Sequence, residues 1–131
     1  MLKKMIIIVC LTSIIVSGCA GLADYDIDLP GNYSILRTSA DEITIAPKTE
    51  IGWGPNVIPA RVVAAGWNEK YIIAKQKVLE SENEFYFWIL NIETGVSEGP
   101  FNKNDFQKKR EEYEISKDVE LTNVEDFKKN K

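Results

Sequence analysis

The hydrophobic pattern of the chain changes character twice. Residues 5–16 form an apolar core of twelve residues, residues 32–98 contain several segments in which apolar and polar residues alternate, and residues 101–113 place apolar side chains at helical spacing. Alternation with period two is typical of strands, whereas spacing of three and four residues is typical of an amphipathic helix. The pattern therefore predicts a short apolar leader, then antiparallel sheet, then one helix.

The alternating region begins with two predicted hairpins. The first joins residues 32–37 and 42–46 through a polar turn, and the second joins residues 60–67 and 71–78. The intervening segment, residues 47–59, holds three prolines and two glycines, which break regular structure and predict a loop. Gly66 lies inside the second hairpin, where a glycine could permit a β-bulge.

The most apolar strand pattern is FYFWILNI, residues 85–92. Both of its faces are apolar, so we expect a central strand with one face on the core and the other beneath a helix or loop. A short strand over residues 96–98 follows, and Gly99-Pro100 is expected to end it. Trp67 and Trp88 lie in apolar strands and are interpreted as core residues.

The C-terminal region returns to helical spacing. Asn102 is a plausible N-cap for a helix over about residues 103–112. Residues 114–121 are interpreted as a last edge strand, and Thr122 with Glu125 as a capping box for a terminal turn. The expected fold class is α+β: an antiparallel sheet of five or six strands with one amphipathic helix from the C-terminal region packed on it.

The first nineteen residues have the pattern of an export signal. Lys3 and Lys4 precede an apolar core of twelve residues, which is shorter than the roughly 18 to 20 residues of a membrane-spanning helix. Val-Ser-Gly-Cys, residues 16–19, resembles the bacterial lipobox, in which the cysteine is alkylated with diacylglycerol before cleavage. An ordinary secretory signal is the alternative. We expect a signal peptide over residues 1–18, a lipidated tether over 19–30, and one domain over 31–131.

This prediction fixes the expected location and the fate of the thiols. Two acyl chains on Cys19 give stable attachment, so the protein is expected on the extracytoplasmic face of the cell membrane. Cys10 leaves with the signal, and Cys19 is capped by lipid. The aspartates at positions 24, 26 and 28 superficially resemble a calcium loop, but the glycine and the final glutamate of that loop are missing. We expect no metal and no cofactor.

Composition narrows the function classes. The chain has no histidine, which removes Ser-His-Asp and Cys-His catalysis and every metal site containing histidine. Its net charge is −4, and loss of Lys3 and Lys4 with the signal leaves 113 residues at −6. A basic face for nucleic acid is therefore not expected.

Trp53 is the candidate binding residue. It stands between two glycines in the proline-rich loop, and exposed aromatic residues on loops often mark recognition sites. The alternative is that Trp53 folds back on the sheet as a lid. The C-terminal region forms a basic end, made of lysine and arginine residues 108–110 and lysines 128, 129 and 131. This basic end could contact anionic lipid or wall polymer, but the interpretation that we favour is a solvated helix face.

Two long segments carry a family resemblance. DIDLPGNYSILRTSADEITIAPK, residues 26–48, and FYFWILNIETGVSEGPFNKNDFQKKREEYEI, residues 85–115, together with the lipobox resemble small uncharacterised lipoproteins of Gram-positive bacilli. The resemblance implies no activity and no catalytic residue, and the single functional position that it carries over is Cys19.

These features favour a non-catalytic, membrane-anchored module that binds an envelope protein, a peptide or a wall component. One alternative is an immunity or inhibitor lipoprotein, in which an acidic face blocks a toxin or hydrolase. The other alternative is a carboxylate-dependent hydrolase, for which Glu50 near Trp53 is the nearest candidate. An enzyme is not expected.

Overall fold

The computed structural model describes residues 24–129, so the predicted signal peptide and Cys19 lie outside the described residues. The elements in chain order are β1 (Tyr25–Asp28), the 3₁₀ turn η1 (Pro30–Asn32), β2 (Tyr33–Arg37), β3 (Ile43–Thr49), β4 (Gly52–Trp53), β5 (Val62–Trp67), β6 (Tyr71–Lys77), β7 (Phe85–Asn91), β8 (Ser97–Phe101), α2 (Lys103–Glu112), β9 (Thr122–Asn123) and α3 (Val124–Lys129).

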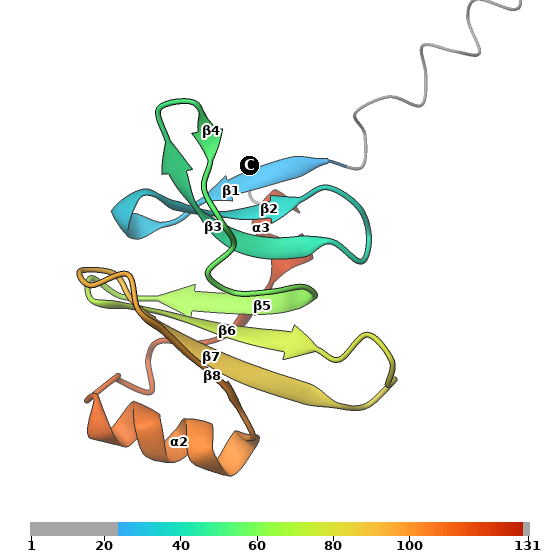
Figure 1. Cartoon of the computed structure of the whole chain (residues 1–131). Coiled ribbons are helices and arrows are strands. Elements are labelled where there is room, and N and C mark those ends of the chain that lie inside the picture. The colour runs from blue at the N-terminus through green and yellow to red at the C-terminus, as the bar shows by residue number, and fades with distance from the viewer. Residues whose placement is uncertain (1–23, 130–131) are drawn as a thin grey trace, which may run out of the picture.

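The strands form two antiparallel sheets that stack on each other, and α2 forms a third layer (Figure 1). The first sheet has the order β1-β2-β3-β4, and the second has the order β8-β7-β6-β5-β9. The predicted class is confirmed: antiparallel sheet with one helix packed on it. The five-stranded sheet carries α2, and the structure adds a second sheet of four strands that the sequence did not predict.

The first core lies between the two sheets and explains why there are two. Ile27, Ile35 and Ile45 are paired neighbours across β1, β2 and β3, and each is at most 6% exposed. They belong to the same buried cluster as Ile72 and Leu90 from the second sheet. Alternation gives each sheet one apolar face, and the two faces cover each other.

The second core lies between the second sheet and α2. Phe87 and Ile89 on β7 face the helix, whereas Leu90 belongs to the core between the sheets. The expectation of a central strand covered on both faces is thereby confirmed. Phe106 of α2 stacks on Phe87, with ring centroids 4.7 Å apart. The helix begins as predicted, because Asn102 Oδ1 accepts a hydrogen bond of 2.8 Å from the Asp105 amide.

The structure corrects the boundary of the predicted tether. Tyr25–Asp28, assigned to the tether over residues 19–30, form strand β1 and pair with β2. Ile27 and Leu29 are buried, whereas Asp26 and Asp28 are exposed. The alternating aspartates are therefore the outer face of a strand, and the folded domain begins before residue 31.

Four local predictions near β5, in β8 and at the C-terminus are also wrong. Residues 114–121 form turns instead of an edge strand, and β9 pairs with β5 in their place. The bulge lies between Val62 and Ala64, whereas the absent Cβ of Gly66 leaves room for the Glu120 carbonyl. Strand β8 continues through Gly99-Pro100 to Phe101. Finally, α3 begins at Val124, so Thr122 lies in β9 instead of capping a helix.

Candidate functional site

Trp53 occupies the short strand β4, where it pairs with Lys48 of β3. Its side chain is 40% exposed, and the Lys48 ammonium lies 5.7 Å from the ring centroid. The ring borders a groove of about 280 Å³ whose other walls come from β1 and β2. Trp53 thus lies against the edge of the first sheet and is partly open to solvent. This position is intermediate between a fully exposed recognition residue and a lid folded back on the sheet.

A larger groove lies between helix α2 and the outer face of the second sheet, and we call it the α2 groove. Its volume is about 510 Å³. Strands β5, β6 and β7, the β6–β7 turn, α2 and the C-terminal segment all contribute to it. It is lined by Ala64, Lys75, Asn83, Phe85, Phe87, Lys103, Phe106, Gln107, Arg110, Leu121 and Asn123.

The floor of the α2 groove is aromatic and largely buried. Phe87 and Phe106, stacked on each other, are 9% and 1% exposed. Phe85 lies two residues before Phe87 on the same face of β7, and Leu121 adds an aliphatic wall. Phe85 and Leu121 are partly exposed, so an apolar ligand group can pack against them. Burial of that group away from water would favour binding.

The rim of the α2 groove carries three cations. The Lys75 ammonium lies 4.2 Å from the centroid of the Phe85 ring, where the negative face of the ring attracts it. Lys103 is exposed in the first turn of α2. Among the described side chains neither lysine has a carboxylate partner, and none of the eleven lining residues is acidic.

Arg110 is the third cation and is held in place by the backbone. Its Nη2 atom donates hydrogen bonds of 2.7 Å to the Ser116 carbonyl and 2.9 Å to the Val119 carbonyl. Burial lowers the pKa of the guanidinium from its ordinary value, but an arginine side chain stays charged at neutral pH. The bonded Nη2 fixes the orientation of the fork, which leaves Nη1 and Nε as further donors.

The basic end predicted from the sequence is divided by the structure. Arg110 lines the α2 groove, whereas Lys109 forms an ion pair of 3.2 Å with Glu112. That hydrogen bond raises the pKa of Lys109 above its usual value. Lys108 is exposed and lies outside the groove. Two neighbouring basic residues of α2 therefore differ in their surroundings.

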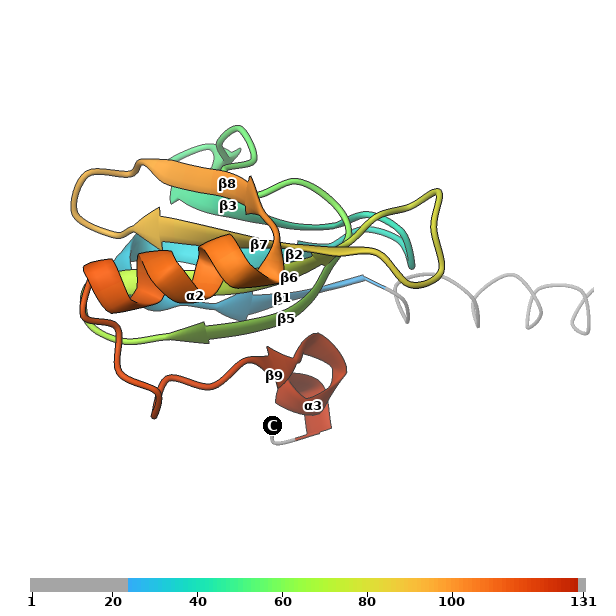
Figure 2. The same ribbon diagram turned by 90° about the horizontal axis from the view of Figure 1, so that it is seen from below.

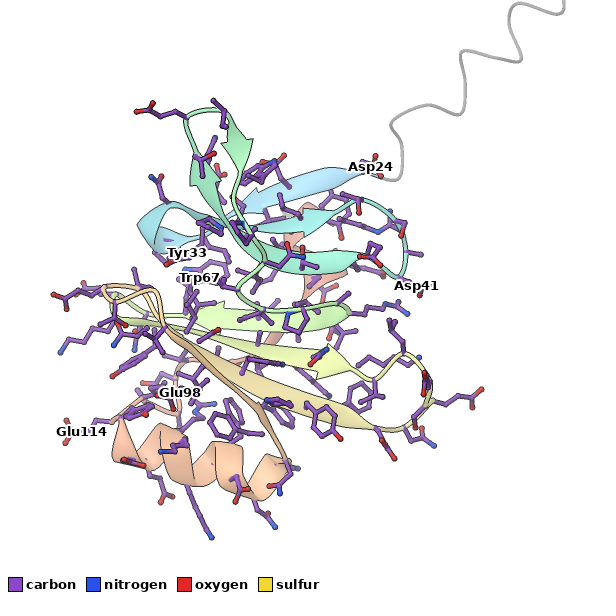
Figure 3. All side chains as sticks on the ribbon, in the orientation of Figure 1. Asp24, Tyr33, Asp41, Trp67, Glu98 and Glu114 are labelled. Atoms are coloured by element: carbon purple, nitrogen blue, oxygen red, sulfur yellow. The ribbon has the colours of Figure 1, made fainter. Side chains whose placement is uncertain are left out.

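At the C-terminal end of α2 the sheet and the helix meet through a polar contact. The Tyr113 hydroxyl lies 2.7 and 2.8 Å from the two carboxylate oxygens of Glu98, which Figure 3 shows on the side of the second sheet that faces α2. This hydrogen bond raises the pKa of the Tyr113 phenol. The Tyr113 ring also stacks on Tyr71, with centroids 5.5 Å apart. These contacts close one end of the helix–sheet interface and hold the helix in position.

A model of one protein family matches residues 30–125, well over half of the 131 residues. The chain belongs to DUF3997, a family of proteins of unknown function. This membership confirms the part of the predicted resemblance that concerns an uncharacterised family. The DUF3997 match contains Trp53 and every lining residue of the α2 groove, whereas Cys19 precedes it. Neither a curated protein nor a solved structure matches the chain. Among residues 24–129, no helix has the length and hydropathy needed to cross a membrane.

Sequence reasoning missed the α2 groove, although one signal was present. In β6 of this DUF3997 domain, Tyr71, Ile73 and Lys75 share one face, and Ile73 is buried beneath the helix. A lysine in phase with residues that face a helix is unusual, because lysine is seldom placed toward a core. That alternation marks Lys75 as a residue at a helix–sheet boundary, but it does not identify Lys103 or Arg110 as its neighbours.

Proposed function

We propose that this protein is a membrane-anchored lipoprotein of a Gram-positive cell envelope and that its domain is a non-catalytic binding module. The anchor is supported by the basic, apolar and lipobox segments that end at Cys19. The binding site is the α2 groove, and its ligand is an acidic peptide segment of an envelope protein that carries an apolar side chain.

The observation that carries this proposal is the composition of the α2 groove. Three cations surround an aromatic floor, and no carboxylate lines it, in a protein whose net charge is −4. In an acidic protein this local excess of positive charge attracts a negatively charged ligand group. The volume of about 510 Å³ lies within the range of about 300 to 1,000 Å³ that is typical of ligand pockets.

A peptide accounts for more of the lining residues than an anionic polymer does. Asn83, Gln107 and Asn123 add amide groups that both donate and accept hydrogen bonds, as peptide backbones require. A polymer of phosphates would use the cations but would leave the partly exposed apolar side chains of Phe85 and Leu121 uncovered. The combination of amides, cations and aromatic rings matches a segment that offers backbone, carboxylate and apolar side chain together.

The position of the α2 groove in the stack of layers also favours a ligand that comes from outside the bilayer. Strand β1, which follows Cys19 closely in sequence, and helix α2 lie at opposite ends of the three-layer stack (Figures 1 and 3). With Cys19 in the membrane, the first sheet is the nearer layer and α2 is the farther one. The α2 groove would then lie in the part of the domain farther from the bilayer, on the side of the wall and its proteins.

A crosslinking pull-down from intact cells with a charge-matched control tests the groove. Lys75→Glu with Lys103→Glu reverses two cations in the groove, and Lys108→Glu with Lys117→Glu makes the same change in net charge at exposed positions outside it. We expect one envelope protein to be recovered with the native protein and with the control pair, and to be lost with the groove pair.

The other outcomes are informative as well. Equal loss with both pairs would mean that overall charge, and not the groove, controls binding. Recovery of wall polymer in place of a protein would keep the site and refute the peptide ligand. Loss with Trp53→Ala instead would move the site to the smaller groove. Mass spectrometry of Cys19 tests the anchor independently, with Cys19→Ala as the control without lipid.

A further inference from the structure

The hairpin between β3 and β4 presents the most exposed apolar side chain in the described part of the chain. Ile51 is 100% exposed at its tip. Thr49 pairs with Gly52, so the turn itself consists of Glu50 and Ile51, and the Thr49 hydroxyl donates a hydrogen bond of 3.1 Å to the Gly52 carbonyl. Gly52 adopts a φ of +134°, which favours glycine. The tip is therefore a closed turn that holds Ile51 away from the sheet.

Trp53 follows this tip and continues its apolar surface. Trp53 is 40% exposed, and the Lys48 ammonium lies 5.7 Å from the centroid of its ring. Tryptophan is enriched where membrane proteins cross the bilayer–water interface, since its ring is apolar and its N–H group is polar. Lysine beside it can extend its ammonium to the headgroups while its methylenes stay against apolar surface.

The hairpin lies beside the point where the described chain begins. Asp24 and Trp53 border the same groove of about 280 Å³. Asp24 is five residues after Cys19, and five residues reach at most about 18 Å when fully extended. A lipid anchor on Cys19 therefore brings Asp24, and Trp53 with it, close to the bilayer surface.

We propose that the β3–β4 hairpin is a second membrane contact, in which Ile51 and Trp53 enter the interfacial layer of the bilayer that holds the lipids of Cys19. The inference rests on the proposed lipidation. Two separated contacts would fix the tilt of the domain against the bilayer, whereas the tether alone would bring the first sheet nearer to the bilayer without fixing that tilt.

The charges around the hairpin specify the kind of lipid surface. Glu50 at the tip and the nearby Asp24 and Asp26 offset the positive charges of Lys48 and Arg37. Anionic headgroups therefore gain little by contact with this surface, and apolar burial supplies the attraction. We expect the contact to form on zwitterionic and on partly anionic membranes alike.

A single fluorescent label tests this contact on the lipidated protein. With the signal removed and the Cys19 thiol used by lipid, Ile51→Cys provides the one reactive thiol of the mature chain. Leu79→Cys is the matched control, because Leu79 is also exposed, at 55%, but lies in the β6–β7 turn of the other sheet. Both proteins are reconstituted into phosphatidylcholine vesicles with and without phosphatidylglycerol.

The expected result is that the label at position 51 loses most of its quenching by aqueous iodide and gains quenching by nitroxide lipids in both kinds of vesicle. The label at position 79 should remain accessible to iodide. Equal iodide quenching at the two positions, with lipid confirmed on Cys19 by mass spectrometry, would refute the hairpin contact and leave the anchor intact. Absence of lipid on Cys19 would refute both the anchor and the hairpin contact.

Discussion

Replacement of Phe106 by alanine tests the packing of α2, on which the α2 groove depends. Phe106 is 1% exposed and stacks on Phe87 with an interplanar angle of 12°. It also belongs to the buried cluster that contains Ile73, Ile89 and Ile115. A buried phenylalanine changed to alanine typically lowers the free energy of unfolding by about 3 to 5 kcal/mol, because the lost burial and the remaining cavity both destabilise.

The same substitution would remove a large share of the total stability, which for a domain is about 5 to 15 kcal/mol. Urea unfolding of residues 19–131, followed by tryptophan fluorescence, gives the free energy of unfolding from the midpoint and the slope. We expect a lower midpoint at unchanged slope for Phe106→Ala. The control is Gln107→Ala, which changes the next, exposed residue and should stay within about 0.5 kcal/mol of the native protein. A loss below about 1 kcal/mol for Phe106→Ala would show that α2 does not pack on the sheet through this ring.

Two further predictions concern contacts between the second sheet and the segment from α2 to Glu120. Gly66→Ala places a methyl group against the Glu120 carbonyl, so we expect it to destabilise by about 1 to 3 kcal/mol in the same urea assay, and a neutral effect would contradict the close approach. The Tyr113 hydroxyl donates a hydrogen bond to Glu98, and this bond raises the pKa of the phenol in the folded protein above its value in the unfolded chain. The hydrogen bond therefore stabilises the fold fully below about pH 10, and this stabilisation is lost as the pH rises through the folded pKa. The free energy of unfolding of the native protein should therefore exceed that of Tyr113→Phe by about 1 kcal/mol at neutral pH. This difference should shrink when the urea titrations are repeated at alkaline pH, and a difference that does not depend on pH would refute the contribution of the hydrogen bond.

The strands and the helix were predictable where the pattern is local. Residues 85–92 show two apolar faces, and each face is covered in the structure. Asn102 signals the start of α2 because an N-cap bond joins residues three apart. The division into two sheets was not predictable, since it depends on packing between distant segments, such as those that place Ile35 of β2 and Leu90 of β7 in one buried cluster.

Strand β1 and the α2 groove show why other features were missed. The alternation around Ile27 was visible in the sequence, but the aspartates beside it favoured a solvated tether, and its burial comes from Ile35 on another strand. Trp53 could be singled out because its neighbours in sequence are glycines. The groove could not, because Lys75 and Lys103 come from different elements that only tertiary packing brings together.

The C-terminus has a further role in the order of folding. Val124 is 2% exposed in the core between the two sheets, whose other fully buried members come from residues 27–90. Figure 2 shows the chain passing from α2 along the side of β5 to α3, where Phe127 contacts Trp67 at 5.3 Å between ring centroids. A ribosome delivers the N-terminus first, so this core stays open until residue 124 has emerged. In the exported protein proposed above, that order would keep this core incomplete until residue 124 has crossed the membrane.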